Sequence, residues 1–231
     1  MKKAALHNLG CKVNAYETEA MQHLLEEAGY EIVPFTQKAD VYVINTCSVT
    51  NMADRKSRQM LHKAKKNNPD SIVVAAGCYV QTSEKEVLND LSVDIVIGND
   101  RKHDLVRLLE EYSLDSVNDT VDDINDGKHD FEELFIDQTK EHTRAFIKVQ
   151  DGCNQFCSYC IIPYARGRVR SRRFENVIAE VERLAANGFK EVVLTGIHLS
   201  SYGVDFEEAT GLLKMCIRDR WILRKLQAFL S

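Results

Sequence analysis

Val41-Tyr42-Val43-Ile44-Asn45-Thr46-Cys47 begins with four consecutive apolar residues and ends in two polar residues and a cysteine. A short, continuously apolar run is typical of a strand that is buried on both faces of a parallel sheet. Apolar runs at 4–6, 72–76 and 95–97 repeat the pattern, and the first two also end at a Gly-Cys pair. The segment therefore predicts one strand of an open parallel sheet.

Helical patterns separate these runs, as a parallel sheet requires. Asn14, followed by Glu17, has the spacing of a capping box and predicts the start of the first helix. A basic helix is expected over 52–67, a short one from Ser83, and another near 102–112. We therefore interpret residues 1–112 as an α/β domain with an open parallel sheet.

The pattern changes after residue 112. Residues 113–142 are rich in Asp and Glu and predict an acidic linker that ends in an edge strand around 131–136. A strand over 145–149, a helix over 175–187 and a strand over 192–194 predict a second β/α domain beginning at 143. One and a half β/α units cannot bury a barrel core, so we expect 143–211 to be the beginning of a larger domain. Residues 212–231 depart from this pattern and are interpreted as an atypical tail.

Composition limits the compartment and the partners. The 231 residues carry a formal net charge of -5, so no global basic field indicates nucleic-acid binding. No apolar run is long enough to span a membrane, and the N-terminus lacks the apolar core of a signal peptide. We expect a cytoplasmic protein with no membrane partner. In that compartment, seven cysteines indicate metal binding or catalysis rather than disulfides.

Three of the cysteines form the motif Cys153-x3-Cys157-x2-Cys160, directly after a predicted strand. Three thiolates can hold three irons of a cubane cluster and leave the fourth iron open to a substrate group. Three alternatives remain: inert reduced thiols, a zinc site completed by His142 or His198, and an electron-transfer cluster with a distant fourth cysteine.

Three further cysteines, Cys11, Cys47 and Cys78, each follow a predicted parallel strand. The carboxyl ends of parallel strands lie at one edge of the sheet, where ligand sites form. We therefore expect these cysteines to share one metal cluster. The alternative is that each is simply a small buried residue.

The loop motif, with Tyr159 before its last cysteine, resembles the radical S-adenosylmethionine (SAM) superfamily. The resemblance implies a partial β/α barrel and a [4Fe–4S] cluster held by Cys153, Cys157 and Cys160. It also implies that the open iron chelates SAM, that Tyr159 lies near the adenine, and that cleavage of SAM yields a 5′-deoxyadenosyl radical.

Segments 8–14 (NLGCKVN), 45–50 (NTCSVT) and 76–78 (AGC) resemble the N-terminal domain of the methylthiotransferases. This resemblance implies a second [4Fe–4S] cluster on Cys11, Cys47 and Cys78 that delivers sulfur. It implies two molecules of SAM, one as methyl donor and one as radical source. Partners would be a substrate, an electron donor and a sulfur source.

Lys12-Val13 after the first cysteine resembles the branch that modifies N6-threonylcarbamoyladenosine next to the anticodon of tRNA. Methylthiolation of isopentenyl-adenosine in tRNA or of a ribosomal protein is the alternative within the family. A non-enzymatic iron–sulfur or zinc protein is the alternative outside it. Family members continue through a complete barrel and an RNA-binding module, so we expect the activity to belong to the parent protein and the chain itself to be inactive.

An arginine run follows the loop cysteines, and guanidinium groups bind phosphate and stack on bases. It favours RNA binding by Arg166, Arg168, Arg170 and Arg172. The alternatives are a solvated loop and pairing with nearby carboxylates. The basic helix over 55–66 is a weaker signal, since an exposed helical face is the better explanation of it.

Overall fold

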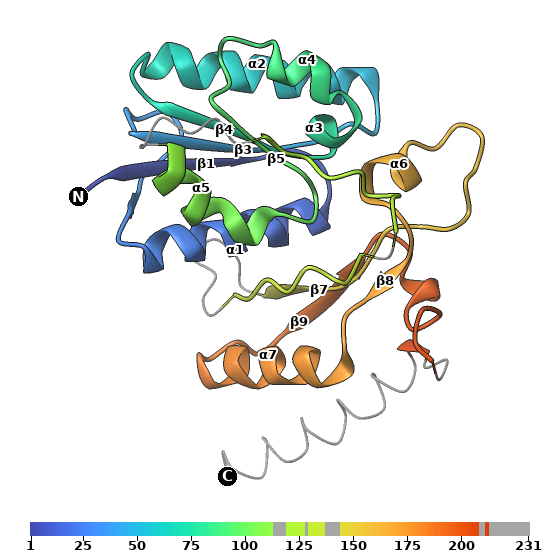
Figure 1. Cartoon of the computed structure of the whole chain (residues 1–231). Helices are drawn as coiled ribbons and strands as arrows, with labels where there is room; N and C mark the ends of the chain where they lie inside the picture. The colour runs from blue at the N-terminus through green and yellow to red at the C-terminus, as the bar shows by residue number, and fades with distance from the viewer. Residues whose placement is uncertain (113–118, 128, 137–143, 208–210, 213–231) are drawn as a thin grey trace.

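Two β-sheets with helix α1 (Lys12–Glu27) between them make up the described part of the chain (Figure 1). The computed structural model describes residues 1–112, 119–127, 129–136, 144–207 and 211–212. Of the predicted tail, residues 212–231, only Leu212 is among the described residues. No described helix is both long and apolar enough to cross a membrane.

The first sheet has six strands, all parallel, in the order β2-β1-β3-β4-β5-β6. Val41 and Val43 of the central strand pack on one face, and Tyr42 and Ile44 pack on the other. Helices cover both faces, which explains why the strand sequences are continuously apolar. The strands are β1 (Lys3–Asn8), β2 (Glu31–Ile32), β3 (Val41–Thr46), β4 (Ile72–Gly77), β5 (Ile95–Ile97) and β6 (Asp119–Thr120).

One layer of helices contains α1 and α5 (Leu105–Tyr112), which follows the short 3-10 turn η1 (Lys102–Asp104). The opposite layer contains α2 (Asn51–Asn67), α3 (Cys78–Thr82) and α4 (Glu84–Leu88) (Figure 1). Helix α2 begins after Thr50, whose Oγ1 accepts a hydrogen bond of 3.1 Å from the Ala53 amide.

The predicted capping box of α1 is wrong. The helix begins at Lys12, and its N-cap residue, Cys11, makes no side-chain capping bond. Asn14 and Glu17 lie inside the helix with fully buried side chains. Both bond to groups outside the helix instead, because tertiary partners compete with the local capping geometry.

The predicted linker adds a strand to the first sheet and packs beside the second. Its residues Asp119–Thr120 form β6, the edge of the first sheet. The predicted edge strand around 131–136 is wrong, since this described segment forms no strand. Leu134 and Ile136 pack against Tyr16 and Ala20 of α1. The segment bonds to side chains, such as Tyr16 Oη donating to the Leu134 carbonyl at 2.5 Å, and so fills the space between α1 and the second sheet.

The second sheet has the order β8-β7-β9. β7 (Ala145–Asp151) and β9 (Val192–Gly196) are parallel and joined by α7 (Phe174–Ala186), whose Val177 and Leu184 pack on the sheet. The short β8 (Arg170–Ser171) pairs antiparallel with β7, and α6 (Ile162–Arg166) precedes it. The predicted class, an α/β fold with an open parallel sheet followed by the start of a β/α unit, is confirmed.

Candidate functional site: two sets of three cysteines

Three cysteines lie at the carboxyl edge of the first sheet. Thr46 and Gly77 are paired across β3 and β4, and Cys47 and Cys78 are the residues that directly follow them. On the other side of β3, Asn8 pairs with Asn45, and Cys11 follows the end of β1. Strand register thus places the sheet-edge cysteines, Cys11, Cys47 and Cys78, at the same edge.

Local contacts bring these thiols close to one another. Gly10 has a positive φ of 107°, and a Cβ at this position would lie 2.8 Å from Cys47 Sγ. The pKa of the Cys47 thiol is raised, mainly by burial and further by the neighbouring Cys78 and Cys11. A backbone hydrogen bond from Val49 lowers this pKa in part. Cys47 and Cys78 are buried, whereas Cys11 is exposed.

Polar side chains surround the sheet-edge cysteines. The Cys11 thiol donates to Asn14 Oδ1 at 3.7 Å. Asn99 Nδ2 donates to Cys78 Sγ at 3.6 Å and to the Ala165 carbonyl at 2.6 Å. The Cys11 and Cys78 sulfurs therefore lie beside hydrogen-bonding groups from α1 and from the loop after β5, and Asn99 links Cys78 to α6.

The loop cysteines, Cys153, Cys157 and Cys160, lie between β7 and α6. Gly152 has a positive φ of 69°, and a Cβ there would lie 1.9 Å from the Arg168 carbonyl oxygen, so only glycine fits. The Cys153 amide donates to the Gly167 carbonyl at 3.1 Å, and the Cys160 amide to the Cys157 carbonyl at 2.9 Å. The two ends of the loop are fixed to each other, and the loop between them faces outward.

Aromatic residues accompany the loop cysteines. Tyr159 is 91% exposed, beside the exposed Cys157. Phe156 adopts a left-handed conformation with φ of 47°, and its ring centroid lies 4.3 Å from the Arg168 guanidinium and 5.8 Å from the Tyr164 ring.

Each set supplies three thiols of the kind that ligates an iron–sulfur cubane. All six cysteines are free thiols. Within the described residues, no three His, Cys, Asp or Glu side chains surround a point closely enough for one metal ion. The thiolates of a cubane bind separate irons, so three cysteines around it need not converge on one atom. Each set would hold three irons and leave the fourth open.

A cluster of buried charged groups lies between the two cysteine sets. Lys148 Nζ lies 2.7 Å from Glu17 Oε1 and 2.6 Å from Asp151 Oδ2. Arg166 Nη1 lies 2.9 Å from Glu17 and 3.0 Å from Asp151. We call the following residues the buried charge cluster: Glu17, Lys102, Lys148, Asp151, Arg166 and Arg170.

The groups of this cluster hold one another in the ionised state. Burial by itself would raise the pKa of Glu17, but Arg166, Lys102 and Lys148 together hold it well below its ordinary value. Burial opposes the ionisation of Asp151 in the same way, and Arg166 and Lys148 lower its pKa. Each carboxylate therefore stays charged inside the protein because cations contact it directly.

Sequence reasoning missed most of this cluster. Lys148 offered a signal, since it interrupts the apolar strand Ala145-Phe146-Ile147-Lys148-Val149. Glu17 was assigned to a helix cap, and Lys102 and Asp151 carried no signal of their own.

Of the four arginines predicted to bind RNA, the structure buries three and exposes one. Arg166, Arg170 and Arg172 are buried. Arg172 pairs with Glu180 and, at 2.8 Å, with Glu133. Arg166 and Arg172 pair with carboxylates, and Arg170 is buried with its Nη2 3.7 Å from Asp151, so none of the three offers an exposed guanidinium to a phosphate. Only Arg168 of the four is exposed.

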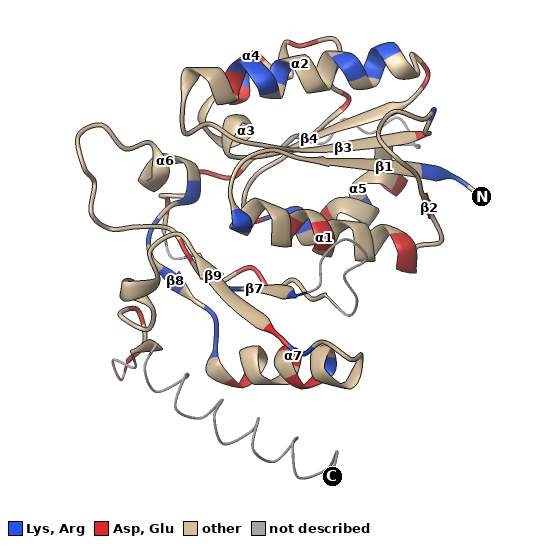
Figure 2. Ribbon diagram, turned by 180° about the vertical axis from the view of Figure 1, so that it is seen from behind, with Lys and Arg blue, Asp and Glu red and all other residues tan. Residues whose placement is uncertain are grey.

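The basic residues of α2 lie on an exposed helical face (Figure 2). Thr50 caps the helix, and Leu61 and Ala64 pack on the sheet, so the opposite side is free for charge. The structure thus agrees with the simpler interpretation of this helix. The exposed basic residues are Arg55, Lys56, Arg58, Lys63 and Lys66.

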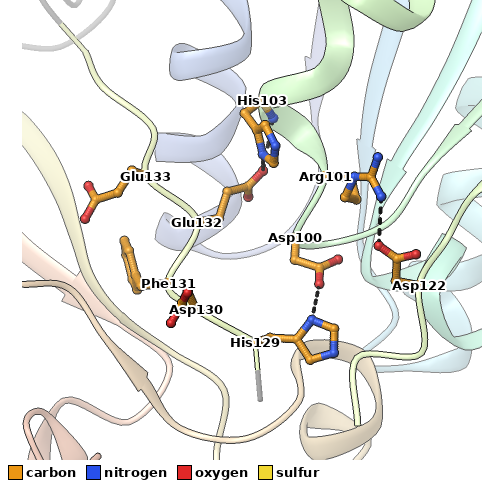
Figure 3. Close-up of a pocket in the computed structure, with 9 residues that line it drawn as sticks. All are labelled: Asp100, Arg101, His103, Asp122, His129, Asp130, Phe131, Glu132 and Glu133. Atoms are coloured by element: carbon orange, nitrogen blue, oxygen red, sulfur yellow. Dashed lines mark hydrogen bonds and ion pairs between the residues drawn. The ribbon is translucent and has the colours of Figure 1, made fainter. Parts of the chain in front are cut away.

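A pocket of about 480 Å³ lies where the linker contacts the end of the first sheet (Figure 3). His129 Nδ1 lies 2.7 Å from Asp100 Oδ2, and His103 Nδ1 lies 3.2 Å from Glu132 Oε1. Arg101 lies 3.0 Å from Asp122. No cysteine lines the pocket. Its paired charges attach the linker to the first domain.

Two models of known protein families match successive parts of the chain. Residues 3–98 match the model described as "Uncharacterized protein family UPF0004", and residues 147–221 match the Radical SAM superfamily. The second match includes residues 212–221, which we expected to depart from the family. The chain is thus a radical SAM protein with an additional N-terminal α/β domain.

Together, these two domains and the relatives below place the chain in the radical SAM methylthiotransferase family. It is 47% identical over 210 residues to the threonylcarbamoyladenosine tRNA methylthiotransferase MtaB of Bacillus subtilis (strain 168), covering 90% of this chain and 46% of that protein. It is 46% identical to MtaB of Aquifex aeolicus (strain VF5), covering 88% of this chain and 50% of the relative. A tRNA-2-methylthio-N(6)-dimethylallyladenosine synthase of Thermoanaerobacter sp. (strain X514) is 35% identical, over 91% of this chain and 45% of that protein. The chain spans about half the length of these relatives.

Among solved structures, the radical S-adenosylmethionine methyltransferase TsrM from Kitasatospora setae has a TM-score of 0.62. The similarity covers 96% of this chain and 52% of TsrM at 16% identity. This similarity shows the fold alone.

Proposed function

We propose that this chain is the N-terminal part of a tRNA methylthiotransferase that acts on N6-threonylcarbamoyladenosine next to the anticodon. The observation that carries the proposal is the presence of two separate sets of three free cysteines, one at the edge of each domain. The greater identity to two MtaB proteins than to the dimethylallyladenosine synthase favours this substrate.

In this proposal the loop cysteines hold one [4Fe–4S] cluster and the sheet-edge cysteines hold a second. When bound, the clusters and SAM supply reductive cleavage of the sulfonium, the methyl group and the transferred sulfur. The protein's part is to present the loop thiols outward from a backbone fixed at Gly152 and Gly167. Tyr159, exposed beside them, is free to pack on the adenine of SAM.

The proposed partners are tRNA, an electron donor and a sulfur source, which meet in the cytoplasm. Arg168 is the arginine that remains a candidate for RNA contact. It is exposed, and it stacks on Phe156 close to Tyr164. Guanidinium and aromatic surfaces of this kind stack on unpaired bases, as an anticodon loop presents them.

Mass spectrometry of tRNA nucleosides tests the assignment. Deletion of the gene for the full-length protein is expected to abolish 2-methylthio-N6-threonylcarbamoyladenosine and to leave the unmethylthiolated nucleoside. Complementation with the wild-type gene should restore the product, whereas the Cys157→Ala gene should not.

Other outcomes identify the alternatives. Loss of the methylthio group from isopentenyl-adenosine would assign the chain to the activity named for its 35% identical relative. Unchanged tRNA nucleosides together with loss of a methylthio group from a ribosomal protein would replace tRNA by a protein substrate.

A further inference from the structure

Arg166, the last residue of α6, joins the loop that precedes it to the first domain. Its side chain is fully buried. Nη2 donates to Asn14 Oδ1 at 2.6 Å, while Nη1 donates to Glu17 Oε1 at 2.9 Å and to Asp151 Oδ1 at 3.0 Å. One guanidinium therefore contacts both α1, which begins after Cys11, and β7, which ends before the loop cysteines.

Asn14 connects Arg166 to two of the sheet-edge cysteines. Its Nδ2 donates to the Leu9 carbonyl at 2.8 Å and to the Thr46 carbonyl at 2.9 Å. Thr46 directly precedes the second cysteine of the set, and the Cys11 thiol itself donates to Asn14 Oδ1. The position of Arg166 thus fixes an amide that holds the backbone beside both cysteines.

The third sheet-edge cysteine is reached through Asn99. Its Nδ2 donates to the carbonyl of Ala165, the neighbour of Arg166, and contacts Cys78 Sγ. Lys102 Nζ donates to Asn99 Oδ1 at 2.8 Å and belongs to the buried charge cluster. Two adjacent residues at the end of α6 therefore contact Asn14, which bonds to Cys11 and to the residue before Cys47, and Asn99, which bonds to Cys78.

The buried charge cluster has more positive than negative charge. Four cationic side chains face two carboxylates, and Glu132, which acts on Lys148 from farther away, reduces this surplus without removing it. Among the described residues, Nε of Arg166 and both Nε and Nη1 of Arg170 are buried without a hydrogen-bond partner. Buried positive charge is costly unless an anion compensates it. Arg166 donates to Asn14, which also accepts from the Cys11 thiol, so an anionic cluster bound by these cysteines would lie beside this surplus charge.

We propose that Arg166 is a positioning residue for the sheet-edge cysteines. With Asn14 and Asn99 it holds the three thiols in place, and it supplies positive charge to the anionic cluster that they bind. The inference rests on the proposed function, because it requires an iron–sulfur cluster at this edge. Charge and hydrogen bonds around cluster sulfurs set the reduction potential and the retention of the metal. Since reduction adds an electron, nearby positive charge favours the reduced cluster.

The test starts from a reference variant with Cys153→Ala, Cys157→Ala and Cys160→Ala, which keeps only the sheet-edge cysteines. We call it the triple-alanine reference. After anaerobic reconstitution with iron and sulfide, the readouts are iron content, the reduction potential from an EPR-monitored titration, and the rate of iron loss to a chelator. Arg166→Gln removes the charge, Arg166→Lys keeps the charge but not the paired contacts, and Asn14→Asp adds a negative charge in an isosteric side chain. Exposed Arg173→Gln is the matched control.

Arg166→Gln and Asn14→Asp are expected to make the reduction potential more negative and to speed iron loss by about 10–100-fold, the usual effect of removing a group that supports metal ligands. Arg166→Lys should restore the potential more fully than the retention, and Arg173→Gln should change neither. If Arg166→Gln fails to fold, the isosteric Asn14→Asp decides the question by the same shift.

The role of Arg166 alone would be overturned if the triple-alanine reference binds about four irons and its Arg166 and Asn14 variants keep its reduction potential and its rate of iron loss. A triple-alanine reference that binds no iron would overturn the proposed function as well. The two failures are therefore distinguishable.

Discussion

Lys148 on β7 and Glu17 on α1 form an ion pair of 2.7 Å between side chains that are 1% and 0% exposed. The two residues are separated by 131 positions in the sequence and come from different domains. A buried pair of this kind does not guarantee net stability, but removal of one partner leaves an uncompensated charge in the interior. The contact between α1 and β7 therefore depends on charges that must be present together.

Glu17→Gln is expected to lower the free energy of unfolding by about 3–5 kcal/mol, because Lys102, Lys148 and Arg166 lose a shared carboxylate. The midpoint of urea unfolding measures the effect. Glu27→Gln on the same helix is the control, since Glu27 is exposed and lies 3.5 Å from His23, and its substitution should cost less than about 1 kcal/mol. Equal effects of the two substitutions would show that the buried pairing is not required.

The contribution of Glu17 to stability should depend on pH. Its pKa in the folded protein lies well below the unfolded value of about 4.3, so the folded state favours the ionised form. The contribution is fully present above that value and is lost as the pH falls through it toward the lower folded pKa. Urea unfolding at pH 7, 5 and 4 should show the difference between wild type and Glu17→Gln narrowing only at the acid end. A difference that grows on acidification would mean that the sign is wrong.

Gly10→Ala should displace Cys47, because the added Cβ would lie 2.8 Å from its sulfur and φ is 107°. We expect the reconstituted chain to lose roughly four irons, those of the sheet-edge cluster. Gly29→Ala is the matched control, since Gly29 also has a positive φ, 84°, but nothing lies within 4 Å of the added atom. The control should retain its iron despite backbone strain of about 1–3 kcal/mol. Iron retention by both variants would show that Gly10 has no role in placing Cys47.

Each cysteine set should account for half of the bound iron. Anaerobic reconstitution of the wild-type chain is expected to give about eight irons, and Cys47→Ala or Cys157→Ala about four each. In the parent protein, a spectral response to SAM should survive Cys47→Ala but not Cys157→Ala, because only the loop cluster chelates SAM in this proposal. One zinc per chain, or retention of all iron in either variant, would contradict the two-cluster assignment.

The identity of each buried strand and the position of its cysteine follow from the sequence by local physics. Continuous apolar runs such as 41–44 require cover on both faces, and parallel strands must end at a common edge. Cys47 and Cys78 could therefore be grouped before any coordinates, and Cys153, Cys157 and Cys160 lie too close in sequence to separate.

Only the tertiary structure decided the role of the charged and polar residues. Asn14 and Glu17 carry the local pattern of a helix cap, and Arg166 and Arg172 that of an RNA-binding run, yet all four are buried and bonded to partners from distant segments. Leu134 and Ile136 likewise pack against α1 rather than extend a sheet. The physical reason is that secondary structure and strand direction depend on neighbours in sequence. The partner of a buried charge depends instead on which domain surfaces meet.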